Sequence, residues 1–195
     1  NFVSGKCSRP INRQEFFTPY NVPLVLAMGR LHENKAFDVL IEASSQLPNT
    51  YLWLAGDGPL RKNLEALAEK LGIKPRVRFL GWRNDPEKLF AAADIFVCPS
   101  RHEPLGNVVI ESWAQGIPVI AADGLGPKNL IQHGENGLLF PIDGANELAG
   151  SIKHLIEEPD IIEKLVSRAS QDFESKFTEN IVVEKYLRFF EKVIR

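Results

Sequence analysis

The fold is decided by residues 94–116, which read DIFVCPSRHEPLGNVVIESWAQG. Residues 94–99 are predicted to form a strand, and the apolar run at 95–98 within it is typical of a strand buried on both faces of a parallel sheet. Residues 108–115 carry a helical pattern that ends at Gly116, since glycine readily takes the left-handed conformation that follows many helices. A strand, a loop and a helix in this order predict one repeat of an α/β fold.

The same repeat extends in both directions along the chain. On the N-terminal side the pattern predicts strands at 23–29, 51–55 and 77–80 and helices at 35–46, 60–71 and 85–92. On the C-terminal side it predicts strands at 118–122 and 137–140, a short helix at 128–132, and three helical segments between about 146 and 195. We therefore expect a Rossmann-like parallel sheet of about six strands with helices on both faces and a helical C-terminus.

Length and composition set the frame for this fold. The 195 residues suffice for one ordinary domain, which we place at 23–195, and residues 1–22 lack periodicity and are predicted to form an interdomain linker or an extended arm. The net charge of -2 gives no reason to expect nucleic acid. Two cysteines, Cys7 and Cys98, favour a reducing compartment over a disulfide framework, so we expect a cytoplasmic location, or a peripheral one at the inner face of a membrane.

In a parallel sheet of this type the ligand lies at the carboxyl ends of the strands, so the loops that follow the strands matter most. Gly29 and Arg30 follow the first predicted strand, and Lys35 opens the next helix. Arginine offers a planar fork and lysine a point charge, and two such cations at one turn suit a phosphate group. Two solvated surface cations beside a glycine turn would give the same pattern.

The turn after the second strand reads Gly56-Asp57-Gly58-Pro59. Its glycines permit either a tight turn or a close approach of a ligand to the backbone. The third glycine of the dinucleotide fingerprint is missing, and the chain has no phosphate-binding P-loop motif, so we do not expect an NAD site here.

The loop after the fourth strand carries most of the chemistry. Its helix should begin near Asn107, so the amides of Gly106, Asn107 and Val108 would point outward at the positive end of that helix and form an anion site. Glu111, in the first turns of the helix, could accept hydrogen bonds from vicinal hydroxyls such as those of a ribose. Glu103 and Glu111 could instead be helix-terminal acids favoured by the dipole. The histidines have no metal-ligand spacing, and we expect no metal site.

These motifs together resemble the C-terminal domain of the retaining group 1 (family 4) glycosyltransferases, which have the GT-B fold. The resemblance covers about 23–158 and is carried by five segments in order: Gly29-Arg30-Leu31 with Lys35, Gly56-Asp57-Gly58-Pro59, Glu103-Pro104-Leu105-Gly106 through Glu111, Gly116-Ile117-Pro118-Val119, and Asn136-Gly137-Leu138-Leu139. Two positions depart from the family pattern. Ala36 stands where glycine is usual, which could tighten the turn, and Lys128-Asn129 stands where Pro-Glu is common.

The resemblance implies a role for each matched residue. Arg30 and Lys35 would bind the donor diphosphate, and Glu103 would contact the hydroxyls of the transferred sugar. The amides after Gly106 would bind the distal phosphate. Glu111 would hold the ribose, and Leu139 with its neighbours would line the nucleoside pocket.

The resemblance also implies the partners of this domain. The first is a nucleotide diphosphate sugar, most simply a UDP-hexose, which would serve as co-substrate without any cofactor or metal. The others are an N-terminal acceptor-binding domain, which is missing here, and a sugar, lipid or glycan acceptor. The full-length protein would then transfer a hexose to an acceptor hydroxyl with retention of configuration. Two rival interpretations stay open at this point, because a fold does not determine a function. One is a non-catalytic nucleotide-sugar-binding or regulatory module, and the other is a related epimerase.

Overall fold

A computed structural model describes residues 9–193 of the chain. Its six parallel strands are β1 (Leu24–Met28), β2 (Tyr51–Ala55), β3 (Val77–Gly81), β4 (Ile95–Cys98), β5 (Val119–Ala122) and β6 (Leu138–Phe140). They are arranged in the order β3-β2-β1-β4-β5-β6. The predicted Rossmann-like sheet of six strands is therefore confirmed.

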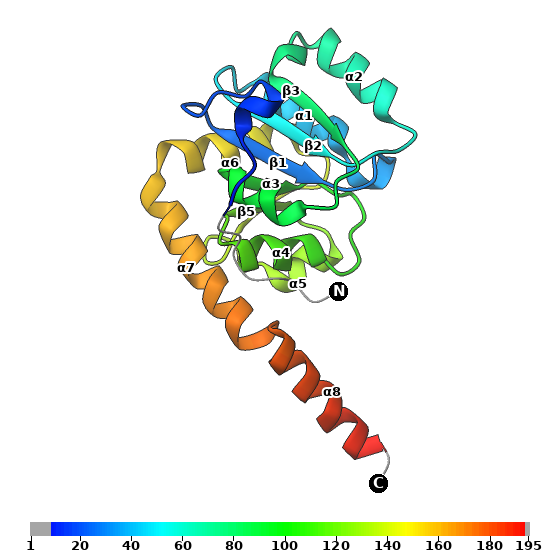
Figure 1. The fold of residues 1–195 in the computed structure, drawn as a ribbon, viewed down its shortest axis with the longest axis vertical. Helices are drawn as coiled ribbons and strands as arrows, with labels where there is room; N and C mark the ends of the chain where they lie inside the picture. The colour runs from blue at the N-terminus through cyan, green and yellow to red at the C-terminus, as the bar shows by residue number, and fades with distance from the viewer. Residues whose placement is uncertain (1–8, 194–195) are drawn as a thin grey trace.

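Helices cover both faces of the sheet (Figure 1). The helices are α1 (Phe37–Ser45), α2 (Arg61–Lys70), α3 (Pro86–Ala92), α4 (Asn107–Gln115), α5 (Leu125–Leu130), α6 (Ala145–Glu157), α7 (Pro159–Lys176) and α8 (Glu179–Val193). Apolar side chains of α1, α2 and α6 form one core cluster with the sheet, and those of α3 and α4 form the other. Successive strand residues point to opposite faces, so each continuous apolar strand supplies both clusters.

The predicted element boundaries shift at two places near the site. The first helix begins at Phe37 and not at Lys35, because a short 3₁₀ turn occupies Glu33–Lys35. The predicted helix at 128–132 lies earlier, as α5 at Leu125–Leu130. The three predicted helical segments at the C-terminus are confirmed, and Figure 1 shows α8 extending away from the sheet beyond α7.

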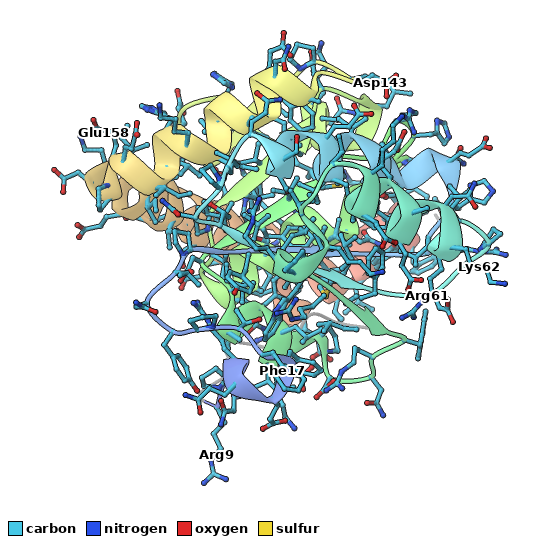
Figure 2. The ribbon with its side chains drawn as sticks, turned by 90° about the horizontal axis from the view of Figure 1, so that it is seen from above. Arg9, Phe17, Arg61, Lys62, Asp143 and Glu158 are labelled. Carbon is cyan, nitrogen blue, oxygen red and sulfur yellow. The ribbon has the colours of Figure 1, made fainter. Side chains whose placement is uncertain are left out.

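Residues 9–22 pack along the edge of the domain, where Figure 2 labels Arg9 and Phe17. The buried Arg13 guanidinium donates to the carbonyl of Ala92 at 2.7 Å and to the Asp94 carboxylate at 2.8 Å. The hydroxyl of Thr18 accepts a hydrogen bond from the buried Trp53 indole at 2.9 Å. The segment is thus attached to the described domain, and its role between two domains stays a prediction. Residues 1–8, with Cys7, lie outside the described part, whereas Cys98 is buried.

Candidate active site

The strand order reverses between β1 and β4, and the loops that follow these two strands form the candidate site. From β1 the chain passes to α1 on one face of the sheet, and from β4 it passes to α4 on the other face. Loops that diverge in this way leave a crevice at the carboxyl ends of the strands. We call residues 29–36 the β1–α1 loop and residues 99–106 the β4–α4 loop.

Lys35 and Glu103 meet across this crevice. The Lys35 Nζ lies 2.5 Å from the Glu103 Oε2, although the two residues are 68 positions apart in the sequence. Their side chains are 25% and 12% exposed, so the pair is largely shielded but can still be reached from solvent. The two residues that sequence reasoning assigned to different parts of a donor thus lie side by side.

Gly29 and Arg30 lie at the start of the β1–α1 loop. Gly29 has φ 151°, and a Cβ atom at this position would lie 3.3 Å from the Cε of Lys35, so the glycine leaves room for the lysine stem. The Arg30 side chain is exposed and makes no hydrogen bond or ion pair with any residue in 9–193. Lys35 is therefore held by a carboxylate, whereas Arg30 is available to bind an anion.

The helix α4 begins at the end of the β4–α4 loop. Gly106 precedes it with φ 72° and ψ 31°, a left-handed conformation that suits glycine. In the described part of the chain the amides of Gly106, Asn107 and Val108 donate no hydrogen bond to protein acceptors. Free amides at the positive end of a helix of nine residues can bind an anion, as the sequence predicts.

Glu111 lies one turn into α4 and is half-buried. Burial raises the pKa of its carboxyl group, and the negative charge of Glu103 raises it further. Glu111 also lines a pocket of about 170 Å³ at the carboxyl ends of β1, β2 and β3, together with Gly29, Gly56, Trp82, Arg83 and Val108. A carboxylate at the wall of a mainly apolar pocket can fix the hydroxyls of a flat ligand that enters it.

Sequence reasoning missed Trp82 and Arg83 in this pocket. Trp82 is 80% exposed, and Arg83 is held by two hydrogen bonds to Asp85 at 2.9 and 2.7 Å. Both follow β3, and the rule that ligands lie at the carboxyl ends of strands would have pointed to them.

The Gly56-x-Gly58 turn packs against the β1–α1 loop, backbone to backbone. A Cβ on Gly56 would lie 1.9 Å from the carbonyl oxygen of Gly29, and one on Gly58 would lie 2.5 Å from that of Leu31. The amide of Leu31 donates to the carbonyl of Asp57 at 3.0 Å. Sequence analysis left a tight turn or a close ligand open for these glycines, and the structure shows a third use, the close packing of two loops that border the site.

Gly126 supports the β4–α4 loop from the other side, and sequence reasoning missed this too. Its amide donates to the carbonyl of Glu103 at 2.9 Å, and a Cβ there would lie 2.4 Å from the same oxygen. Nearby Lys128, one of the departures from the family pattern, is exposed and pairs with Asp123 at 3.2 Å. The other departure, Ala36, takes the left-handed conformation with φ 49° and ψ 39°, which costs a residue with a Cβ about 1–2 kcal/mol.

Leu139 and Asn136 lie near the far edge of the sheet. Leu139 is on β6 and does not line the pocket beside Glu111, so its role in nucleoside binding stays a prediction. Asn136 is buried and structural: its side chain donates to the Asp172 carboxylate at 2.9 Å, and its carbonyl accepts from the Trp113 indole at 3.1 Å. Burial raises the pKa of Asp172, but hydrogen bonds from Lys176, Asn136 and Arg168 outweigh that effect and hold it below its ordinary value.

Within residues 9–193, no three His, Cys, Asp or Glu side chains are grouped so that they could hold a metal ion. Over the same residues, every helix is too short or too polar to cross a bilayer.

Comparison with known proteins shows the family of this chain. Residues 8–172 match the sequence pattern of the family described as glycosyl transferases, group 1. LpsE of Rhizobium meliloti (strain 1021), a lipopolysaccharide core biosynthesis glycosyltransferase, is 42% identical over 188 residues, which cover 96% of this chain and 55% of LpsE. LpsD of the same organism is 38% identical and is covered to 56%. The chain thus spans about half the length of these relatives.

Solved structures show the same domain. HepE of Anabaena in complex with UDP and glucose is 31% identical and superimposes with a TM-score of 0.85, covering 88% of this chain and 49% of HepE. HepE has also been solved with UDP-glucose. Sucrose-phosphate synthase of Thermosynechococcus elongatus is 26% identical, with a TM-score of 0.85 over 100% of this chain and 52% of the synthase. These likenesses confirm the GT-B architecture and the resemblance to a C-terminal domain that the sequence indicates. The chain belongs to the group 1 glycosyl transferases.

Proposed function

We propose that this chain is the donor-binding half of a retaining glycosyltransferase and that it binds a nucleotide diphosphate sugar. One observation carries the proposal. The Lys35–Glu103 pair, the free amides at the start of α4 and the Glu111 pocket all lie along one crevice at the carboxyl ends of the strands. This crevice offers cations and amides for phosphates, and carboxylates for hydroxyls.

Each part of the donor has a matching group. Arg30 and Lys35 bind the diphosphate, and the amides of Gly106, Asn107 and Val108 bind the phosphate next to the sugar. Glu103 accepts hydrogen bonds from the sugar hydroxyls, and its contact with Lys35 supports a sugar site next to the diphosphate site. Glu111 holds the ribose at the wall of the pocket beside Trp82, which the base can enter. Leu139 remains a further candidate for contact with the nucleoside.

The reaction that these groups serve is cleavage of the bond between the sugar and the diphosphate. Negative charge builds up on the leaving diphosphate, and fixed cations and amides stabilise that charge without reorganising during the step. Arg30, Lys35 and the α4 amides supply this stabilisation, so we propose that neither a metal ion nor a cofactor is needed. A UDP-hexose is the donor we favour, since the similar HepE has been solved with UDP-glucose.

Binding to this chain should depend on the diphosphate. We expect UDP-glucose, GDP-mannose and ADP-glucose to raise the melting temperature of the protein, with UDP-glucose giving the largest shift. Uridine, which lacks the diphosphate, should bind more weakly than these ligands. Arg30→Ala should weaken UDP binding about tenfold, the size of one charge-assisted hydrogen bond, and leave uridine binding unchanged. Thermal shift and calorimetry would measure both effects.

A matched control is Lys153→Ala, which removes an exposed cation on α6 that pairs with Glu157 of the same helix. It should leave all affinities unchanged. If no nucleotide diphosphate bound at millimolar concentration, or if Arg30→Ala weakened uridine and UDP equally, the donor site would be placed wrongly.

Transfer should need the rest of the protein. We propose that an N-terminal domain holds a sugar, lipid or glycan acceptor, and that the full-length enzyme works in the cytoplasm, free or at the inner face of a membrane. Positioning the acceptor and excluding water both depend on closure of two domains around the donor. The chain on its own is therefore expected to bind donor without transferring sugar. Assay with radiolabelled donors and simple sugar acceptors would test this, and turnover at the rate of a complete enzyme would refute it.

A further inference from the structure

Arg101 connects the two loops that carry Lys35 and Glu103. It lies in the β4–α4 loop, two residues before Glu103, and its side chain is 31% exposed. Neither the family pattern described above nor the proposed donor contacts assign it a role.

The guanidinium of Arg101 reaches the β1–α1 loop and the start of α1. It donates to the carbonyl of Glu33 at 2.9 Å and makes two hydrogen bonds to the Asp38 carboxylate at 3.0 and 2.7 Å. Next to it, the amide of His102 donates to the carbonyl of Asn34 at 3.3 Å. Four hydrogen bonds thus join the residues on either side of Lys35 to the residues just before Glu103.

A third segment joins the same guanidinium. Its Nε donates to the Asp143 carboxylate at 2.5 Å, and Asp143 lies on the loop that leads into α6, where Figure 2 labels it. Asp143 has φ 62°, a left-handed conformation that few non-glycine residues adopt. The hydrogen bond to Asp38 is the largest effect that raises the pKa of Arg101, and that to Asp143 adds to it.

The Lys35–Glu103 contact is a poor candidate for setting the distance between the loops. A lysine side chain is long and flexible, and Lys35 meets Glu103 through a single contact. A planar guanidinium that forms a two-pronged bond to a carboxylate has a defined geometry. Of the two contacts, that of Arg101 thus has the better-defined geometry.

We infer that Arg101 is a positioning residue for the donor: it holds the β1–α1 loop against the β4–α4 loop so that Lys35 and Glu103 meet at the diphosphate and the sugar. The expected effect of Arg101 on donor binding rests on the proposed function. Its effect on the position of the two loops concerns the protein without ligand.

The test compares Arg101→Gln with Arg101→Lys and with a matched control. Arg188→Gln is that control, because it also removes an arginine paired to a carboxylate, on exposed α8. In the free protein, NMR cross-peaks between the side-chain protons of Lys35 and Glu103 should be present in wild type and in Arg188→Gln. They should disappear in Arg101→Gln, and Arg101→Lys should weaken them.

The second readout is nucleotide affinity by calorimetry. Arg101→Gln should weaken UDP-glucose and UDP about tenfold, within the range for groups that share one hydrogen-bond network, and change uridine less than twofold. In a Lys35→Ala background it should cause little further loss of UDP affinity, because Arg101 acts on the diphosphate through Lys35. A merely structural role would lower all three affinities and would add to the effect of Lys35→Ala.

The outcomes separate the two claims. If wild type bound no nucleotide but Arg101→Gln lost the cross-peaks, the proposed function would fall and the loop-positioning role would stand. If wild type bound UDP-glucose and Arg101→Gln kept both the cross-peaks and the affinity, the inference about Arg101 would be overturned. Should Arg101→Gln fail to fold, Arg101→Lys gives the same comparison with the charge retained.

Discussion

Gly56→Ala is expected to lower the free energy of unfolding by about 4 kcal/mol, the sum of a strained backbone and an overpacked contact. Gly56 has φ 138°, which few side chains tolerate, and its Cβ would lie 1.9 Å from the carbonyl oxygen of Gly29. That oxygen belongs to backbone at the end of β1, so it cannot turn away as a side chain could. The turn after β2 and the loop after β1 would have to separate.

The matched control is Gly72→Ala, just after α2. Gly72 also has a positive φ, of 70°, but no atom lies within 4 Å of its Cβ position, so only the backbone cost of about 1–2 kcal/mol applies. Urea denaturation of both variants would separate the two contributions. Equal losses of stability would show that the close approach of the two loops contributes nothing.

The contact between Gly56 and the backbone of Gly29 could not be predicted from the sequence. The alternation of apolar strands and helices predicts the sheet, because each element type has its own periodicity and breakers. The glycines of the Gly56-Asp57-Gly58 turn signal that something comes close to the backbone. The sequence does not say whether this is a ligand or another loop, since the answer depends on a contact between residues 27 positions apart.

The role of some site residues could be predicted from the sequence, and the role of others could not. Lys35, Glu103 and Glu111 could be proposed from the loops in which they occur, because the carboxyl ends of parallel strands share one edge. Asn136 carries an equally recognisable motif, yet it is buried and bound to Asp172 on α7. Its role depends on a helix 36 residues further along the chain, and no local pattern indicates that partner.

The support for the β4–α4 loop was also out of reach from the sequence. Arg101 and Gly126 hold this loop from two sides, through Asp38 and through the carbonyl of Glu103. Neither residue belongs to a motif with a known chemical role. Both become visible only when side-chain and backbone contacts between distant segments are known.

Glu111→Gln is expected to weaken the binding of a nucleotide diphosphate and to stabilise the free protein at the same time. Burial raises the pKa of the Glu111 carboxyl above its ordinary value of 4.5, and Glu103 adds to the shift. The ionised group therefore fits the folded state less well than the unfolded one. Glutamine has nearly the same shape and no charge, so it removes this cost and should raise the free energy of unfolding at neutral pH.

The affinity should change in the opposite direction. A carboxylate accepts hydrogen bonds from ribose hydroxyls more strongly than an amide oxygen does, and bonds to a charged group are worth about 1.5–3 kcal/mol. We expect the binding free energy to weaken by about 1.5 kcal/mol in Glu111→Gln and by up to about 3 kcal/mol in Glu111→Ala. Calorimetry with UDP would give the affinity, and urea denaturation would give the stability.

The pH dependence follows from the same shift. The cost of the buried charge is present above the raised pKa, and it is relieved as the pH falls through that pKa toward 4.5. In this window the contribution of Glu111 to stability should improve while the affinity for UDP falls, because the protonated group is a weaker acceptor. Both of these pH-dependent changes, in stability and in UDP affinity, should be absent in Glu111→Gln.

Glu174→Gln on α7 is the matched control, since the Glu174 side chain is exposed and makes no hydrogen bond or ion pair within residues 9–193. It should change neither quantity. If Glu111→Gln lowered stability and affinity together, Glu111 would be a structural residue of α4, and the ribose contact would have to be sought elsewhere along the crevice. An increase in stability with a loss of affinity is the pattern expected of a binding group that the fold keeps at a cost.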